Sequence, residues 1–257
     1  MEEEQLDLVL VPLGVLLMGA YHVWLVFKIK RSPKRTVIGI NALSREQWVI
    51  SMMAELGLSY LLNKEKMLHV AMLDVCPQDP MRNGVLAVQT IRNNIMASTL
   101  LATTAITLSS IIGVFVSSKA SSSKLVYGNK TDTISSVKHF LILVCFLVAF
   151  LCNVQSIRYY AHVSFLVTLP TIDSRGDSVA YVTRSLNRGS YFWSLGLRAF
   201  YLSFPLFLWI FGPIPMFLCC CIMLGVLYFL DTTTTITRNL HSHSLREDLK
   251  SDSVQAV

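Results

Sequence analysis

The N-terminal part of the chain contains an apolar run, residues 6–27, that is interrupted only by Asp7. The hydrocarbon core of a bilayer is about 30 Å thick, and a helix rises about 1.5 Å per residue, so twenty-two residues are enough to cross it. Three glutamates precede the run, and five lysines and arginines follow it within residues 28–35. Cations accumulate on the cytosolic side of membrane proteins, so this run predicts a retained anchor with the N-terminus outside.

The composition extends this prediction to the whole chain. Of its 257 residues, 53% are hydrophobic and 15% are charged, whereas soluble domains carry about 25% charged residues. These values predict an all-α fold, a polytopic membrane helix bundle that forms one membrane domain. The net charge of +6 comes from cations beside apolar runs, so it indicates topology, and no nucleic-acid partner is expected.

The last apolar block, residues 199–230, decides the number of spans. As one helix it would be about 48 Å long, too long for a single span without strong tilt. Gly212 and Pro213 stand in its middle and favour a turn. We therefore expect five spans, or four if the block is one kinked helix. The predicted spans are residues 6–27, 95–116, 140–157, 191–211 and 214–230.

Charge counts support this topology. With five spans, residues 28–94, 158–190 and the tail 232–257 are cytosolic, and they hold seventeen of the 22 lysines and arginines. The outer loop, residues 117–139, holds four. Asn129 begins an Asn-Lys-Thr sequon in this loop and is a candidate glycosylation site. Membrane lipids are the expected surroundings, and the plasma membrane or another secretory-pathway membrane is the expected location.

The cytosolic segment 36–94 is the largest predicted piece outside the membrane. Ser44 and Gln47 resemble a capping box that starts an amphipathic helix, which would lie on the membrane or pack under the bundle. Asp79 and Pro80 predict the start of a second helix that runs into residues 95–116. This segment is also the expected docking site for a protein partner.

Polar side chains gather where the predicted spans meet the cytosol. Ionisable groups in membrane segments usually face the bundle or a wet cavity, so they predict a cytosol-facing vestibule whose arginines bind an anion. The alternative, which we favour, is that these arginines reach lipid headgroups or pair with carboxylates to fix helix packing. The residues are Gln89, Arg92, Asn93, Gln155, Arg158, His162 and Arg198.

Enzyme and metal motifs are absent from the sequence. It contains no Gly-x-Ser-x-Gly, Walker, His-Glu-x-x-His or Gly-x-Gly-x-x-Gly pattern, and no Cys-x-x-Cys pair. The acids are few and scattered. We therefore expect no enzyme, no cofactor and no metal site.

Several stretches resemble one family. They are Gln-Thr-Ile-Arg-Asn-Asn at 89–94, continuing to residue 106, Asn-Arg-Gly-Ser-Tyr-Phe-Trp at 187–193, Trp-Ile-Phe-Gly-Pro at 209–213, and Ser-Arg-Glu-Gln-Trp at 44–48. They are similar to plant proteins of the domain of unknown function 599 family, over about residues 6–231. The resemblance implies an integral membrane protein with several helices and bacterial relatives. It implies no reaction and assigns no functional residue.

Three functions fit these observations. The leading hypothesis is a non-enzymatic scaffold or accessory subunit of a membrane assembly. The second is a small-solute or anion transporter or channel that uses the polar vestibule. The third, which has the least support, is a membrane-embedded enzyme that acts on lipid.

Overall fold

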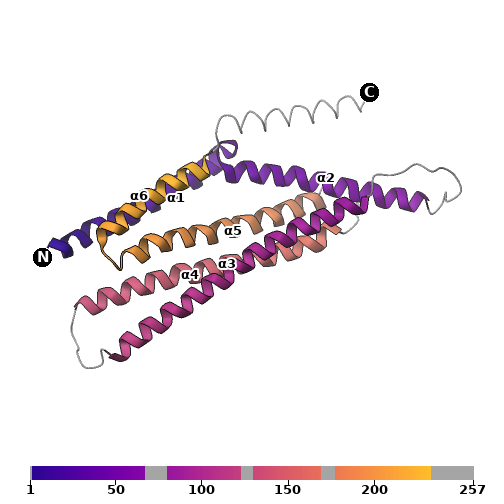
Figure 1. The fold of residues 1–257 in the computed structure, drawn as a ribbon. Helices are drawn as coiled ribbons and strands as arrows, with labels where there is room; N and C mark the ends of the chain where they lie inside the picture. The colour runs from indigo at the N-terminus through magenta and orange to yellow at the C-terminus, as the bar shows by residue number, and fades with distance from the viewer. Residues whose placement is uncertain (1, 67–79, 123–129, 169–176, 233–257) are drawn as a thin grey trace. The chain divides into compact units, whose positions relative to one another are not determined.

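The described part of the protein is almost entirely helical. The computed structural model describes residues 2–66, 80–122, 130–168 and 177–232 (Figure 1). The all-α fold is confirmed, because the only β-type pairing among these residues is an isolated bridge between Thr36 and Thr232. In chain order the helices are α1 (Glu2–Arg31), the 3₁₀ turn η1 (Pro33–Arg35), α2 (Val37–Lys66), α3 (Pro80–Ser122), α4 (Lys130–Thr168), α5 (Asp177–Leu208) and α6 (Pro213–Asp231).

The chain divides into two compact units. The first consists of Met1–Leu43 and Gly212–Val257, and the second consists of Ser44–Phe211. The first unit therefore contains α1, η1 and α6, and the second contains α3, α4, α5 and most of α2.

In the first unit, α1 and α6 lie side by side and run in the same direction (Figure 1). A Cβ at Gly14 would meet the Cys220 thiol at 3.2 Å, and further along both helices the Tyr21 hydroxyl donates to the buried Asp231 carboxylate over 2.7 Å. The contacts therefore advance toward the C-terminal ends of α1 and α6 together. Two parallel helices in one membrane cross it in the same direction.

Thr36 starts α2. Its hydroxyl accepts a hydrogen bond from the backbone N–H of Gly39 at 3.2 Å and donates to the carbonyl of Pro33 at 3.1 Å. This is the N-cap arrangement that satisfies a free donor of the first helical turn. The predicted helix start at Ser44 is wrong, because Ser44 lies inside a helix that Thr36 has already capped.

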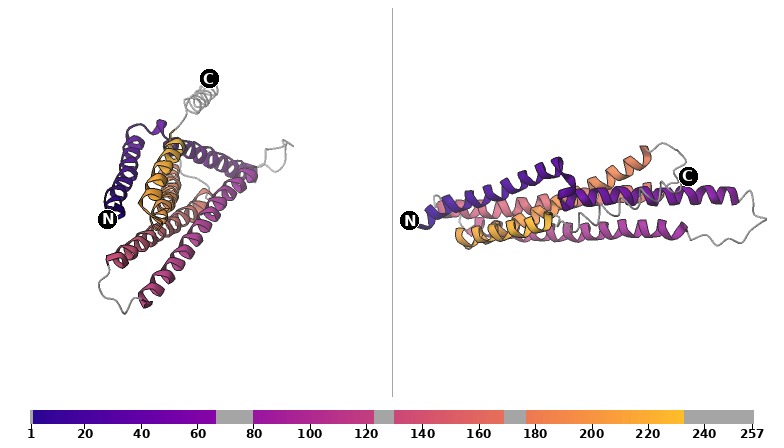
Figure 2. Two further views of the ribbon diagram at one scale, coloured as in Figure 1. Left: turned by 60° about the vertical axis from the view of Figure 1, so that its left-hand side comes forward. Right: turned by 90° about the horizontal axis from the view of Figure 1, so that it is seen from above.

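In the second unit, α4 packs against both α3 and α5 (Figures 1 and 2). The neighbours are antiparallel, because contacts that advance along α4 move backwards along α5. Lys138 Nζ of α4 donates to the carbonyl of Trp209 just beyond α5 at 3.0 Å, and His162 hydrogen bonds to the hydroxyl of Tyr181 at 3.0 Å. Residues 138–162 of α4 thus lie along residues 181–209.

Two glycines let α4 and α5 approach closely. A Cβ at Gly196 would lie 2.6 Å from the side-chain nitrogen of Asn153 and 3.3 Å from the carbonyl oxygen of Ala149. A Cβ at Gly189 would lie 3.1 Å from the ring of Tyr160. Small residues at such contacts are typical of helix pairs in membranes, where close packing supplies much of the association energy.

Within the described residues, four helices are long and apolar enough to cross a membrane. They are α1, α3, α4 and α6, and they contain the predicted spans 6–27, 95–116, 140–157 and 214–230. The predicted span 191–211 falls largely on α5, which at 32 residues is long enough but does not meet the same standard of apolar composition.

The last apolar block is two helices. α5 ends at Leu208 and α6 begins at Pro213, so the alternative of one kinked helix is wrong. Gly212 has a φ of 149°, a conformation that favours glycine, and Pro213 follows at the first helical position, where its missing N–H costs nothing. The predicted break at these two residues is confirmed.

Candidate functional site

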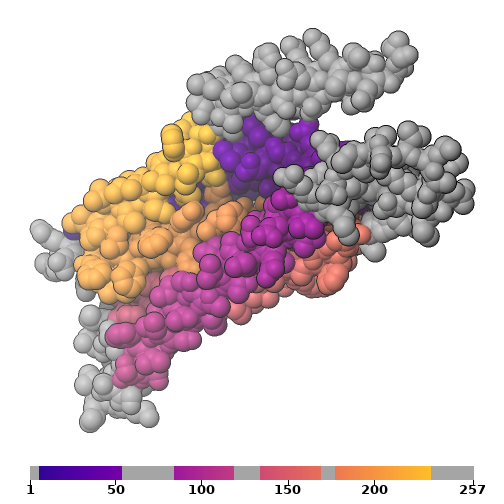
Figure 3. Space-filling model, turned by 45° about the vertical axis from the view of Figure 1, so that its right-hand side comes forward, coloured from indigo at the N-terminus to yellow at the C-terminus, as the bar shows by residue number. Residues whose placement is uncertain are grey.

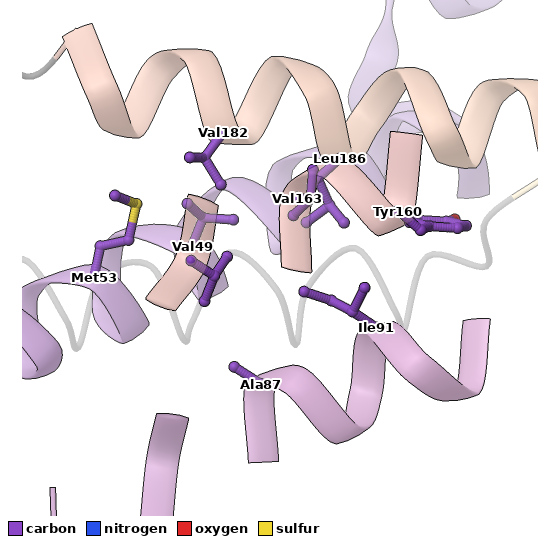
Figure 4. Close-up of a cluster of buried hydrophobic side chains, with 9 residues drawn as sticks. Val49, Met53, Ala87, Ile91, Tyr160, Val163, Val182 and Leu186 are labelled. Atoms are coloured by element: carbon purple, nitrogen blue, oxygen red, sulfur yellow. The ribbon is translucent and has the colours of Figure 1, made fainter. Parts of the chain in front are cut away.

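A cluster of buried apolar side chains joins the four helices of the second unit at one end. Its members point toward one another in Figure 4, and the middle of α2 supplies Val49 and Met53. The cluster fixes where the neighbouring polar groups lie, because every one of these helices contributes to it. Its buried members are Val49, Met53, Ala87, Ile91, Tyr160, Val163, Val167, Val182 and Leu186.

A small polar pocket adjoins this cluster and shares Tyr160 with it. The pocket has a cavity volume of about 130 Å³ and receives at least one side chain from each of α2, α3, α4 and α5. A water molecule occupies about 30 Å³ of liquid, so the pocket could hold a few waters or one small ionic group. Its lining residues are Arg45, Asn94, Tyr160, Ser190 and Trp193.

Arg45 supplies the positive charge of the pocket. Its Nε donates to the side-chain oxygen of Asn187 at 2.8 Å, which fixes the guanidinium plane. Burial lowers the pKa of Arg45, and the phenols of Tyr160 and Tyr191 partly offset this effect. No described carboxylate contributes to this shift, and no described residue forms a hydrogen bond with the two Nη groups of Arg45.

The inner wall of the pocket is rich in donors. The hydroxyl of Tyr160 interacts with those of Ser156 and Ser190, and both Tyr160 and Ser190 are buried. Trp193 Nε1 is buried and has no hydrogen-bond partner among the described residues. An unpaired buried donor costs roughly 1–3 kcal/mol, a cost that a bound acceptor would remove.

The chemistry of this lining fits an anion. Arginine presents its donors in a planar fork that matches carboxylate and phosphate oxygens, and the indole and hydroxyl groups add further donors. None of the five lining side chains is acidic, so nothing in the lining would neutralise Arg45 before a ligand arrives. The pocket is much smaller than the roughly 300–1,000 Å³ of typical organic-ligand sites, so it fits one charged group rather than a whole metabolite.

The pocket lies at the ends of three predicted spans. Asn94 and Ser190 directly precede the spans 95–116 and 191–211, and Tyr160 follows the span 140–157 by three residues. Since a helix rises about 1.5 Å per residue, all three side chains come from within about 5 Å of a predicted boundary.

The residues of the predicted vestibule do not line this pocket. Arg92 and Arg158 are exposed, on α3 and α4, and Arg198 is half-buried on α5. His162 hydrogen bonds to Tyr181 instead of opening a cavity. The remaining members are exposed or partly exposed, so the vestibule stays a prediction: Gln89 and Asn93 on α3, and Gln155 on α4.

A family comparison places the chain among known sequences. A family model described as "Protein of unknown function, DUF599" matches residues 9–76 and 71–236. The chain belongs to the DUF599 family. The resemblance inferred from the sequence is thus confirmed, and the plant origin stays a prediction. No curated protein and no solved structure matches this DUF599 protein, and the family description assigns no activity.

Sequence reasoning missed the central residue of the pocket in this DUF599 protein. Arg45 stands one residue after Ser44 in the segment read as a capping box, and nothing local to it indicates a binding site. It joins residues that lie roughly 50 to 150 positions away only when α2 packs against the other three helices. The predicted glycosylation site Asn129 lies outside the described residues.

Proposed function

We propose that this DUF599 protein is a non-enzymatic integral membrane protein that crosses the membrane five times and binds a small anion at its cytosolic side. The observation that carries the binding function is the Arg45 pocket, where, among the described residues, a half-buried guanidinium without an acidic partner meets the unpaired donor of Trp193. The expected ligand group is a carboxylate or a phosphate.

Two packing arrangements support five crossings. α5 runs antiparallel to α4 along residues 138–162, so if α4 crosses the membrane, α5 crosses it at the same depth. In the first unit, α1 and α6 are parallel, which requires an odd number of crossings in total. Four crossings would make α1 and α6 antiparallel.

The charge distribution supports an N-terminus outside. The first cytosolic piece would follow α1, whose last turn holds Lys28, Lys30 and Arg31. This orientation puts Arg45 and the ends of α3, α4 and α5 that line the pocket on the cytosolic side. The membrane in which the protein resides is proposed to be the plasma membrane or another membrane of the secretory pathway.

Transport of the anion is the second candidate. Buried polar side chains continue from the pocket into the bundle, because Ser156 donates to the Gly189 carbonyl at 2.8 Å and Ser98 donates to Ser156 at 3.4 Å. Asn153 follows on α4, fully buried, with a side-chain oxygen that has no partner among the described residues. Such a series of groups would give an anion polar contacts beyond the pocket.

Calorimetric titration of the purified protein with inorganic phosphate and acetate tests the proposal. We expect saturable binding of one anion per chain with a Kd on the order of 1 mM, because a few charge-assisted hydrogen bonds supply about 4 kcal/mol. Uptake of phosphate into liposomes that contain the protein would show that the protein transports the anion as well as binding it. If neither anion binds, the proposal is contradicted. The better explanation is then the scaffold role, with segment 36–94 as the docking site for a protein partner.

A further inference from the structure

We propose that the anion held by Arg45 is the phosphate of an anionic phospholipid from the cytosolic leaflet. The inference rests on the proposed function, and it names the ligand of that same site. Three observations support it: the level of the pocket in the bundle, its small size, and the surfaces that surround it.

The predicted span boundaries place the pocket at the level of lipid phosphates. Asn94, Tyr160 and Ser190 lie at the predicted cytosolic ends of their spans, within about 5 Å along the helix axis. The headgroup region begins where the hydrocarbon core of about 30 Å ends. A donor group at this height therefore meets lipid phosphate at a far higher local concentration than any soluble anion.

Exposed cations mark the same level on the surface. Arg92 on α3, Arg158 on α4 and Arg188 on α5 are all exposed, and each lies within a few residues of a lining residue. Long basic side chains at helix ends reach toward headgroups. These arginines would attract anionic lipid to the surface, while Arg45 would hold one phosphate in the pocket.

The size of the pocket indicates that most of its ligand lies elsewhere. A cavity of about 130 Å³ holds a phosphate group but leaves no room for a glycerol backbone with two acyl chains. Exposed apolar side chains are available for these chains on the membrane side of the pocket. Tyr191 and Leu195 follow Ser190 on α5, and Met96 follows Asn94 on α3.

The lining also separates anionic from zwitterionic lipids. A choline headgroup brings a quaternary ammonium beside its phosphate, and that cation would approach Arg45 with no carboxylate in the lining to stabilise it. A phosphate that carries no cation avoids this repulsion. Phosphatidic acid, whose headgroup is the phosphate alone, is therefore the best probe.

In Figure 3, α3 runs along one face of the second unit and forms part of the surface there. Its exposed threonines do not compete for the phosphate, because their hydroxyls bond within the helix. Thr99 donates to the Ile95 carbonyl at 2.9 Å, and Thr103 donates to the Thr99 carbonyl at 3.0 Å. The hydroxyls of Thr99 and Thr103 are therefore not free donors for a phosphate.

Binding to protein in phosphatidylcholine nanodiscs tests the inference, with three probes titrated: water-soluble short-chain phosphatidic acid, short-chain phosphatidylcholine and inorganic phosphate. We expect phosphatidic acid to bind at least about tenfold more tightly than inorganic phosphate, because its chains add apolar contacts, and phosphatidylcholine not to bind. Arg45→Ala should abolish this preference, and Arg184→Ala, which removes an exposed cation of α5 that does not line the pocket, should keep it.

The other outcomes separate the two proposals. Equal affinities for inorganic phosphate and phosphatidic acid would overturn the lipid ligand and leave the anion site intact. Tight phosphatidic acid binding that survives Arg45→Ala would also overturn it, because the lipid would then bind elsewhere on the surface. If no probe binds, the proposed function fails together with the inference.

Discussion

Replacing Arg45 with alanine is expected to weaken phosphate binding roughly 10- to 100-fold. A hydrogen bond to a charged group contributes about 1.5–3 kcal/mol, and each 1.4 kcal/mol is a factor of about ten in affinity. Arg45 is the only cation among the five lining side chains, so no neighbour in the pocket replaces its charge. Arg45→Lys should show a smaller loss, because lysine keeps the charge but loses the fork and the bond to Asn187. Calorimetric titration of the variants measures both effects.

The matched control is Arg92→Ala, which removes the same charge from an exposed position on α3 outside the pocket. It should change affinity by no more than about threefold, since salt screens exposed charges. Arg45→Ala also removes the hydrogen bond to Asn187, so that variant changes helix packing as well as the pocket. A second variant, Asn94→Leu, alters the lining and leaves that hydrogen bond in place. Equal losses in Arg45→Ala and Arg92→Ala would show that the net charge, and not the pocket, binds the anion.

Replacing Gly196 with valine is expected to destabilise the second unit by about 3 kcal/mol, near the upper end of typical overpacking costs. The new Cβ would lie 2.6 Å from the side-chain nitrogen of Asn153, which is fully buried and already donates to the Ala149 carbonyl at 2.8 Å. The Ala149 carbonyl, at 3.3 Å, is backbone and cannot turn aside. Unfolding by denaturant in detergent micelles or bicelles measures the change.

Gly113→Val on α3 is the control for this substitution. Apart from Gly113 itself, its chain neighbours and the backbone of its own helical turns, no atom lies within 4 Å of a Cβ built at Gly113, so the new side chain meets open space. Its stability should stay within about 1 kcal/mol of the parent, with Gly196→Ala falling between the two valine variants. Similar unfolding free energies for the two valine variants would mean that α4 and α5 are not packed as closely as described.

The sequence predicted those features that depend on neighbouring residues. Pro80 starts α3, and Gly212 with Pro213 separates α5 from α6, because proline and glycine act on the backbone locally. The start of α2 was predicted at the wrong place because two polar signals compete there. The Thr36 hydroxyl accepts a hydrogen bond from the N–H of Gly39, so the helix begins there and Ser44 lies inside it.

The candidate site depends on packing that the sequence does not display. Arginines at the borders of predicted spans drew the prediction toward Arg92 and Arg158, yet both are exposed. Arg45 was overlooked because it lies far from every predicted span and enters the pocket only when Val49 and Met53 pack into the apolar cluster. An arginine beside an amphipathic helix face has no distinctive local pattern.

The amino-acid composition of α5 also understates how well this helix could cross a membrane. One face of this helix is buried with small or polar residues, among them Thr183, Ser190, Gly196 and Ser203, which lower its average hydropathy. A helix packed inside a bundle needs fewer apolar residues than one that faces lipid all round. Its alignment with α4 and the parallel packing of α1 and α6 both favour a crossing that composition alone does not indicate.

The proposal of five membrane crossings with a cytosolic pocket is tested most directly by the membrane side of each terminus. Epitope tags at the N-terminus and the C-terminus can be probed with antibody in intact cells and in permeabilised cells. We expect the C-terminal tag to become accessible once the plasma membrane alone is permeabilised. The N-terminal tag should lie on the opposite side, accessible in intact cells for a plasma-membrane protein and only after internal membranes are opened for a protein of an internal membrane. Accessibility of both tags from the same side would mean an even number of crossings and would contradict the account.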